Sequence, residues 1–263
     1  GDIEKPFIES ARLFTPGPGA TSTEVLSALT WLRNAQKTNG AWTDGKNAPQ
    51  STSFFAVRAL AFDADASTTL AKAKTYFNTQ FPDSVIPLSY TAGARAIFGE
   101  DTTYMVDRIL RTGRSGIDYR AYGTHDGFKS SPIATSAFLI GANEALTHNA
   151  SSSDYVSEIL IDALPFYSQI QNSDGSFPGT SPVLATTDVI EALSPFRSSV
   201  AVATSTSGNV VTYSAETIVA NAILYLRGTQ QTNGAWNDSS LQTSRALLSF
   251  YFGVYRFLKS SRS

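Results

Sequence analysis

The chain has 263 residues, 42% of them hydrophobic, which is enough for one substantial core and argues against disorder. Its formal net charge of −2 provides no basic surface for nucleic acid. The absence of cysteine excludes disulfides, thiolate metal sites and a cysteine nucleophile. Because only 16% of the residues are charged and Ser and Thr are abundant, we expect a secreted or cell-surface protein.

The N-terminal residues 1–19 are predicted to form an irregular arm that ends in Pro16-Gly17-Pro18-Gly19. We expect residues 20–258 to form a single domain and residues 259–263 a short tail, and the chain is compatible with a place in a larger surface protein. No signal peptide is visible, and no stretch reaches the roughly 18 uncharged apolar residues that a membrane span needs. We therefore predict no membrane span.

One sequence pattern recurs along the chain. Residues 31–42 (WLRNAQKTNGAW) and 225–236 (YLRGTQQTNGAW) match in register, 194 residues apart. A third copy lies at 166–177 (FYSQIQNSDGSF), and a weaker one at 113–119 (GRSGIDY). The glycines at the shared position are separated by 76, 59 and 59 residues and are Gly40, Gly116, Gly175 and Gly234. This recurrence indicates a repeat protein.

Each repeat has the same order of elements. An apolar helix ends at Asn-Gly or Asp-Gly, where glycine adopts the left-handed conformation that closes a helix. An aromatic residue follows two positions later and is expected to fold back on that helix as a structural clasp rather than stack on a sugar. A second, Ala-rich helix comes next, which we expect at 51–62, 88–98, 133–146, 183–193 and 241–257. The wide first gap contains a degenerate first helix over 70–81.

These elements predict an all-α fold of about five helix pairs, because one pair cannot bury its apolar face alone and must stack on its neighbours. The stack either closes into an α/α toroid or stays open as a solenoid. A small β-hairpin interrupts the pattern near 200–213, where residues 200–203 and 210–213 flank the turn Ser207-Gly208-Asn209. A lone hairpin is marginally stable, so we expect it to pack on the helices.

The segments at 36–42, 171–177 and 230–236 share the pattern Gln-x-x-Asn/Asp-Gly-x-Trp/Phe, which resembles the QW repeat of squalene-hopene cyclases. Looser forms occur in protein prenyltransferase β-subunits, thioester domains and the α/α domain of cobalamin carriers. Residues 174–177 followed by 185–193 are similar to that last group and its bacterial surface relatives. The resemblance covers residues 20–258 and implies a terpenoid cyclase-like α/α toroid. It is specific for fold rather than for function.

The catalytic residues of these families do not carry over to this sequence. Class II terpene cyclases use an Asp-x-Asp-Asp acid, whereas Asp63-Ala64-Asp65-Ala66 lacks the adjacent acid pair and is expected to be a solvated turn. Prenyltransferase zinc sites and thioester domains both need a cysteine, and the chain has none. A cobalamin carrier usually covers its ligand with a second domain, for which this chain has no room. We predict no cofactor and no metal.

The predicted second helices share one polar feature. In each of them a charged residue precedes an Ala-Leu or Ala-Ile step. One interpretation is a mixed-charge pocket floor that binds a polar or anionic ligand, and the other is helix capping or Arg–Glu pairing between neighbouring helices. The five residues are Arg58, Arg95, Glu144, Glu191 and Arg245.

A second candidate site is the polar segment 111–129, which we expect to be a loop. Arginine neutralises a uronate carboxylate in polysaccharide lyases while tyrosine or histidine moves the proton, so the segment has the residue types of a lyase. The same residues in a long loop often only pack and solvate. The catalytic candidates are Arg114, Tyr119, Arg120 and His125, whereas His148 is expected to cap a helix C-terminus.

The sequence favours a non-catalytic, secreted or surface-exposed toroid that binds a small molecule, a glycan or a protein. A polysaccharide lyase is the first alternative. A divergent terpene cyclase without the Asp-x-Asp-Asp acid is the second.

Overall fold

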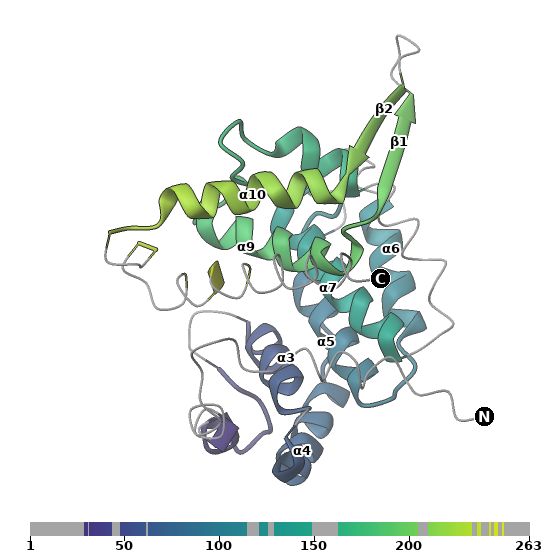
Figure 1. The fold of residues 1–263 in the computed structure, drawn as a ribbon. Helices are drawn as coiled ribbons and strands as arrows, with labels where there is room; N and C mark the ends of the chain where they lie inside the picture. Colours follow the sequence, from purple (N-terminus) through teal and green to yellow (C-terminus); the bar gives the residue numbers. More distant parts are fainter. Residues whose placement is uncertain are drawn as a thin grey trace, which may run out of the picture. The chain divides into compact units, whose positions relative to one another are not determined.

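The computed structural model describes residues 29–30, 32–43, 48–61, 63–114, 121–125, 129–148, 163–204, 210–232, 236–237, 242, 245–246 and 249. These residues are mostly helical and include one two-stranded antiparallel sheet (Figure 1). Within them, no helix combines the length and the apolar character needed to cross a bilayer. The predicted arm at 1–19 and tail at 259–263 lie outside the described residues.

The chain divides into two compact units, which are described separately. The first unit comprises Gly1–Ile109 and Gly141–Ser153, and the second comprises Leu110–Ile140 and Asp154–Ser263. The helices α6 and α7 contribute residues to both units.

The first unit contains α3 (Pro49–Leu60), α4 (Ser67–Asn78), α5 (Val85–Ile97) and most of α6 (Thr103–Arg114). A proline in the first turn of α3 has no backbone N–H, so one of the donors that a helix N-terminus leaves unpaired is absent. The helix α4 ends at Asn78, so the expectation that it reaches Phe81 is wrong, and the Phe81 side chain is exposed. Pro82 gives the reason, because a proline disfavours helical geometry in the residue before it.

Small residues allow close helix packing in the first unit. A Cβ atom on Gly141 of α7 would overlap the carbonyl oxygen of Ser89 in α5. A Cβ on Gly93 of α5 would lie 2.7 Å from the Phe54 ring and 3.2 Å from the Gly141 Cα. The α5 backbone therefore approaches both α3 and the end of α7 more closely than larger side chains would permit.

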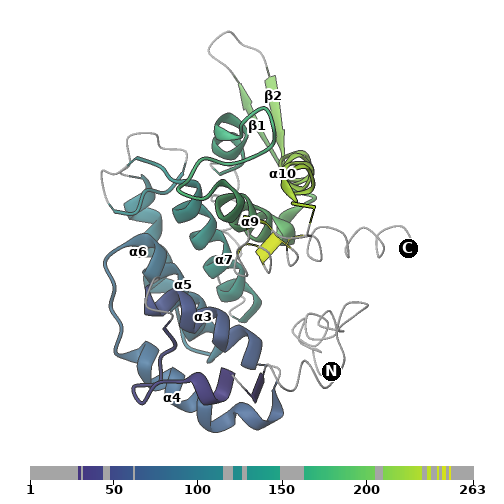
Figure 2. The ribbon, with the colours of Figure 1, turned by 90° about the vertical axis from the view of Figure 1, so that its left-hand side faces the viewer.

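The second unit contains the first half of α7 (Pro132–His148), helical residues 163–170, α9 (Pro182–Leu193) and α10 (Ala215–Thr229). Ser181 and Ser214 cap α9 and α10, since each side chain accepts a hydrogen bond from a backbone N–H in the first turn. The helices α9 and α10 pack side by side (Figures 1 and 2). Of the last predicted helix, the described residues 242, 245, 246 and 249 are helical.

The predicted β-hairpin is confirmed as β1 (Val200–Thr204) paired with β2 (Val210–Ser214). Its turn lies outside the described residues. Ala201 is buried, but Val200, Val202 and Val210 are 60–68% exposed. The hairpin projects from the helices of the second unit (Figure 1), so the expectation that it packs on helices holds only for part of it.

The repeats have the same hydrogen bonds, which confirms the sequence pattern. The Gln36 side chain donates to the carbonyl oxygens of Gly40 at 3.0 Å and Thr69 at 2.9 Å. The Gln171 side chain donates to those of Gly175 and Ile218, both at 3.0 Å. Thr69 belongs to α4 and Ile218 to α10, so each clasp, defined as residues 36–42 and 171–177, also contacts the helix that opens the next pair.

The clasp glycines have the predicted left-handed backbone. Gly40 has a φ of 87° and Gly175 a φ of 88°. A Cβ at Gly40 would overlap the Lys72 carbonyl of α4, and a Cβ at Gly175 would overlap the Asn221 carbonyl of α10. Glycine is therefore required at both positions for two reasons, namely the left-handed backbone conformation and the close approach of the next helix.

The aromatic residues of the repeats are buried, which confirms that they are structural clasps. The Trp42 indole donates to the Leu32 carbonyl at 2.7 Å, and the Trp236 indole donates to the Leu226 carbonyl at 2.8 Å. Both bonds span ten residues. Trp42, Phe177 and Trp236 are each at most 3% exposed, so their ring faces are closed to a sugar.

The weaker repeat is shifted relative to the sequence prediction. The backbone N–H of Trp42 donates to Ser53 Oγ at 2.8 Å, and that of Phe177 donates to Thr186 Oγ1 at 3.1 Å. The matching bond in this repeat runs from the Tyr122 N–H to Thr135 Oγ1 at 3.0 Å. Tyr122, which is 5% exposed, therefore has the clasp position that the sequence pattern assigned to Tyr119.

Candidate functional site

The predicted polar feature of the second helices forms an ion pair in the first unit. Arg58 lies in the last turn of α3, and its Nε is 2.6 Å from Glu144 Oε1 near the end of α7. His148, one turn further on α7, has its Nε2 3.9 Å from Glu144 Oε2. The Arg58 side chain is 27% exposed and the Glu144 side chain 12%, so the pair is partly open to solvent.

Two phenylalanine rings lie close to the guanidinium of Arg58. It lies 5.4 Å from the centre of the Phe54 ring and 6.0 Å from that of Phe55, within the range of cation–π attraction. The Tyr90 ring is 5.1 Å from Phe54 and 5.4 Å from Phe55. Phe54 is fully buried, whereas Phe55 is only half-buried. We call Arg58, Glu144, His148 and Phe55 the Arg58 cluster.

Arg95, also of the first unit, is engaged with backbone at the end of a helix. Its Nε and Nη2 donate to the Phe77 carbonyl at 3.2 and 3.0 Å, and its Nη2 also donates to Asn78 at 3.1 Å. These are the last carbonyls of α4, which have no partner within the helix. Arg95 therefore caps α4, and we leave it out of the proposed ligand site.

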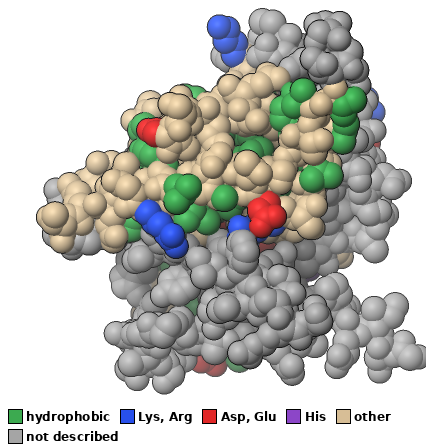
Figure 3. Space-filling view, turned by 45° about the horizontal axis from the view of Figure 1, so that its top comes forward, with side chains coloured by type: hydrophobic (Ala, Val, Ile, Leu, Met, Phe, Trp, Pro, Cys, Tyr) green, Lys and Arg blue, Asp and Glu red, His purple; other side chains and the backbone are tan. Residues whose placement is uncertain are grey.

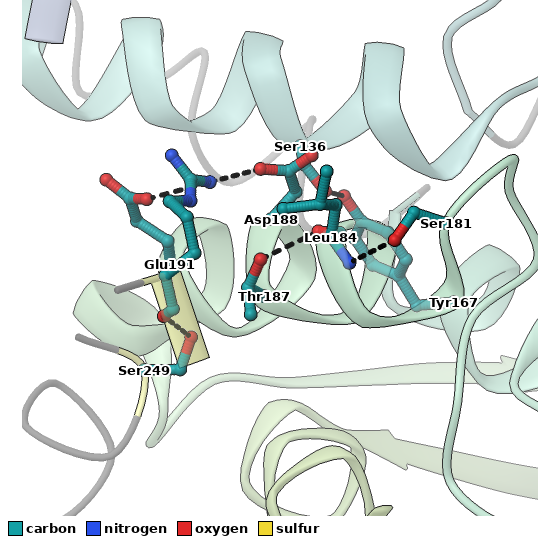
Figure 4. Close-up of polar contacts among 9 residues, drawn as sticks. Ser136, Tyr167, Ser181, Leu184, Thr187, Asp188, Glu191 and Ser249 are labelled. Carbon is teal, nitrogen blue, oxygen red and sulfur yellow. Dashed lines mark hydrogen bonds and ion pairs between the residues drawn. The ribbon is translucent and has the colours of Figure 1, made fainter. Parts of the chain in front are cut away.

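The second unit holds a separate group of charges, formed by Asp188 and Glu191 of α9 with Arg245 (Figure 4). The Arg245 guanidinium contacts Asp188 Oδ1 and lies 3.2 Å from Glu191 Oε2. The three side chains are 13–20% exposed. Burial raises the pKa of Asp188 to about 6, against the lowering effect of Arg245 and with a further rise from the Glu191 charge.

Hydroxyl groups near these charges have partners of their own. Ser136 Oγ of α7 and Tyr167 Oη form a buried hydrogen bond of 2.8 Å, and Thr187 Oγ1 donates to the Leu184 carbonyl at 2.8 Å (Figure 4). Tyr167 is fully buried and lies edge-on to Phe177. These hydroxyls therefore belong to the packing of the second unit.

The described residues contain few of the lyase candidates. Arg111 to Arg114 lie in α6, so the expectation that the whole segment 111–129 is a loop is wrong. Nothing is described of the side chain of Arg114, and Tyr119 and Arg120 lie outside the described residues. The His125 side chain is exposed, and its Nδ1 is 3.3 Å from Thr124 Oγ1. Of the four candidates, His125 is the one whose side chain is among the described residues.

The aspartates that resemble a cyclase motif have a structural role. Asp63 forms an ion pair with Arg33, and its other oxygen accepts from the Asp65 N–H, which begins the 3-10 turn Ala64–Ala66. Asp63 is 6% exposed and Asp65 is 82% exposed, so the expected solvated turn describes Asp65 only. Within the described part of the chain, no three His, Asp or Glu side chains lie close enough together to bind a metal.

The sequence analysis did not include two residues of these clusters among its candidate site residues. Their spacing from residues that it did include could have indicated them. Asp188 lies three residues before Glu191, and His148 four residues after Glu144. Residues three and four apart share a helix face. His148 is in the last turn of α7, where the sequence placed it as a capping residue.

Each of the two charge clusters places an arginine against carboxylate groups, so each presents both hydrogen-bond donors and acceptors. No protein-family model matches the chain, and neither a curated protein nor a solved structure matches it. The interpretation of the clusters therefore depends on their chemistry.

Proposed function

We propose that this protein is a non-catalytic, secreted or cell-surface binding module of the terpenoid cyclase-like α/α-toroid type. It binds a neutral, hydroxyl-rich ligand such as a glycan at the Arg58 cluster. The observation that carries this proposal is the 2.6 Å pair between Arg58 and Glu144, which is partly open to solvent and lies beside the half-buried Phe55 ring.

The pairing of Arg58 argues for a neutral ligand over an anionic one. An anion would have to compete with the Glu144 carboxylate for the guanidinium, and Glu144 would then be left partly buried without its counter-charge. A sugar hydroxyl can instead donate to Glu144 and accept from Arg58 without breaking the pair. The partly exposed Phe55 ring offers an apolar surface for the C–H groups of a sugar.

Glycan binding to the purified protein tests this function. We expect a screen of neutral and uronate-containing oligosaccharides to yield neutral ligands, whose affinity calorimetry then measures. The substitution Arg58→Gln should weaken binding at least about tenfold, since it removes a charge-assisted hydrogen bond. The matched control is Arg108→Gln, because Arg108 pairs with the exposed Asp83 elsewhere in the first unit.

The lyase alternative and binding at another place predict different results. Release of an ultraviolet-absorbing unsaturated product from a uronate polymer would establish the lyase and overturn the non-catalytic proposal. Binding restricted to anionic ligands, or an equal loss in the Arg58 and Arg108 variants, would contradict recognition at the Arg58 cluster.

A further inference from the structure

The sequence of the β-hairpin in the second unit contains no charged residue. No ionisable side chain other than Tyr213 lies between Arg197 and Glu216. In the antiparallel register Val200 is opposite Ser214, and Val202 is opposite Thr212. Opposite residues share a face of the sheet, so one face combines exposed valines with hydroxyl side chains. Figure 3 shows hydrophobic groups on a surface of this unit that carries few charged side chains.

The outer edge of β1 lacks the usual protection of an edge strand. Among the described residues, β1 pairs only with β2, so its other edge presents backbone N–H and C=O groups outward. The sequence Val-Ala-Val-Ala-Thr contains no lysine or proline, which natural proteins place on edges to prevent pairing. Two strands are also fewer than a sheet needs for independent stability.

We propose that this edge is a self-association surface, on which β1 of one molecule pairs antiparallel with β1 of a second copy. The result is a four-stranded sheet across a twofold axis. Antiparallel pairing of one strand with itself is isologous, so one surface serves both partners. The lack of charged residues favours a second copy of this chain as the binding partner. Two uncharged hairpins can pair without like-charge repulsion, whereas a charged strand from another protein would have no opposite charge to contact here.

The paired sheet also explains the exposed valines. In the proposed pairing Val202 of one copy lies opposite Val202 of the other, so Val200 and Val202 of the two copies lie on one continuous face and the Val202 side chains become apolar neighbours across the axis. This inference is independent of the glycan proposal, because the hairpin belongs to the second unit and the Arg58 cluster to the first.

Sedimentation velocity over a concentration series tests the proposal. We expect the wild-type mass to rise from the 28.2 kDa of one chain toward twice that value. The substitution Val202→Lys brings two positive charges together across the axis and should hold the protein at the monomer mass. The control Leu224→Lys changes an equally exposed apolar residue of α10 and should associate as the wild type does.

A mixing experiment separates loss of pairing from loss of folding. Val202→Glu should also be monomeric by itself, but an equimolar mixture with Val202→Lys should recover the dimer mass because opposite charges then meet across the axis. A wild-type protein that stays monomeric up to about 1 mM would overturn the proposal. The same holds for equal effects of the Val202 and Leu224 substitutions, or for a mixture that fails to associate.

Discussion

The environment of Asp188 disfavours the ionised form of its carboxyl group. Burial of the carboxyl group is the main cause of its raised pKa of about 6, and the Glu191 carboxylate adds to the rise. Arg245 opposes both effects without overcoming them. The sequence identifies Asp188 only as a helical residue, because Arg245 is 57 positions away and becomes its partner only when the chain folds.

This raised pKa predicts a pH dependence of stability that depends on one side chain. Because the folded-state pKa is above the unfolded value of about 3.9, the contribution of Asp188 to stability is fully present below about pH 4 and is lost as the pH rises through about 6. Urea unfolding at several pH values should show the wild type losing about 2 to 3 kcal/mol relative to Asp188→Asn between pH 4 and pH 7.

Asp101 provides the control for this measurement. It is exposed, and the Thr103 backbone N–H lowers its pKa, so its contribution is present above the unfolded pKa and lost as the pH falls. The substitution Asp101→Asn should therefore change the pH profile in the opposite sense. Parallel profiles for the wild type and Asp188→Asn would show that the Asp188 carboxyl is not buried as described.

At the scale of elements, the clasp connects one helix pair to the next. Gln171 bonds within its own clasp and to α10, and Gly175 allows the α10 backbone to approach. The first unit repeats this arrangement with Gln36, Gly40 and α4. The pattern recognised in sequence is thus a turn that follows one helix and joins it to the next helix pair.

The substitution Gly175→Ala should destabilise the protein by about 2 to 4 kcal/mol, because the added Cβ meets both a left-handed φ of 88° and the Asn221 carbonyl. The matched control is Gly228→Ala in α10, where a Cβ meets nothing within 4 Å. That change should stabilise by up to about 1 kcal/mol, since alanine favours the helix. Thermal unfolding measures both, and equal shifts would contradict the clasp.

Element positions are predictable where local chemistry sets them. Asn-Gly and Asp-Gly correctly mark glycines with a left-handed backbone, but the helices before them already end at Ala35 and Ile170, so the prediction that helices end at these dipeptides is wrong. Alternation of valine and alanine correctly marks the hairpin. The errors have local causes as well. Charges in segment 111–129 suggested a loop, yet Met105, Val106 and Ile109 bury one face of α6 and the helix extends to Arg114. A short helix is stabilised by such packing more than by the polarity of its last turn.

At the scale of the whole molecule, the proposed toroid makes a prediction about size. A compact monomer of 263 residues has a radius of gyration of about 18 Å, whereas an open row of helix pairs is larger. We expect small-angle scattering of the Val202→Lys variant, in which the proposed self-association is removed, to give a value near this figure. A markedly larger radius would indicate an open solenoid instead.

The residues of this chain are enough to predict a helical repeat with left-handed glycines after its helices, buried aromatic rings and one hairpin. These features depend on turn chemistry and periodicity over a few positions, which a sequence displays directly. The partners of the charged residues were decided by packing. Arg58 and Glu144 are 86 positions apart, and whether such residues form an ion pair or line a charged pocket depends on which helices the folded chain places together.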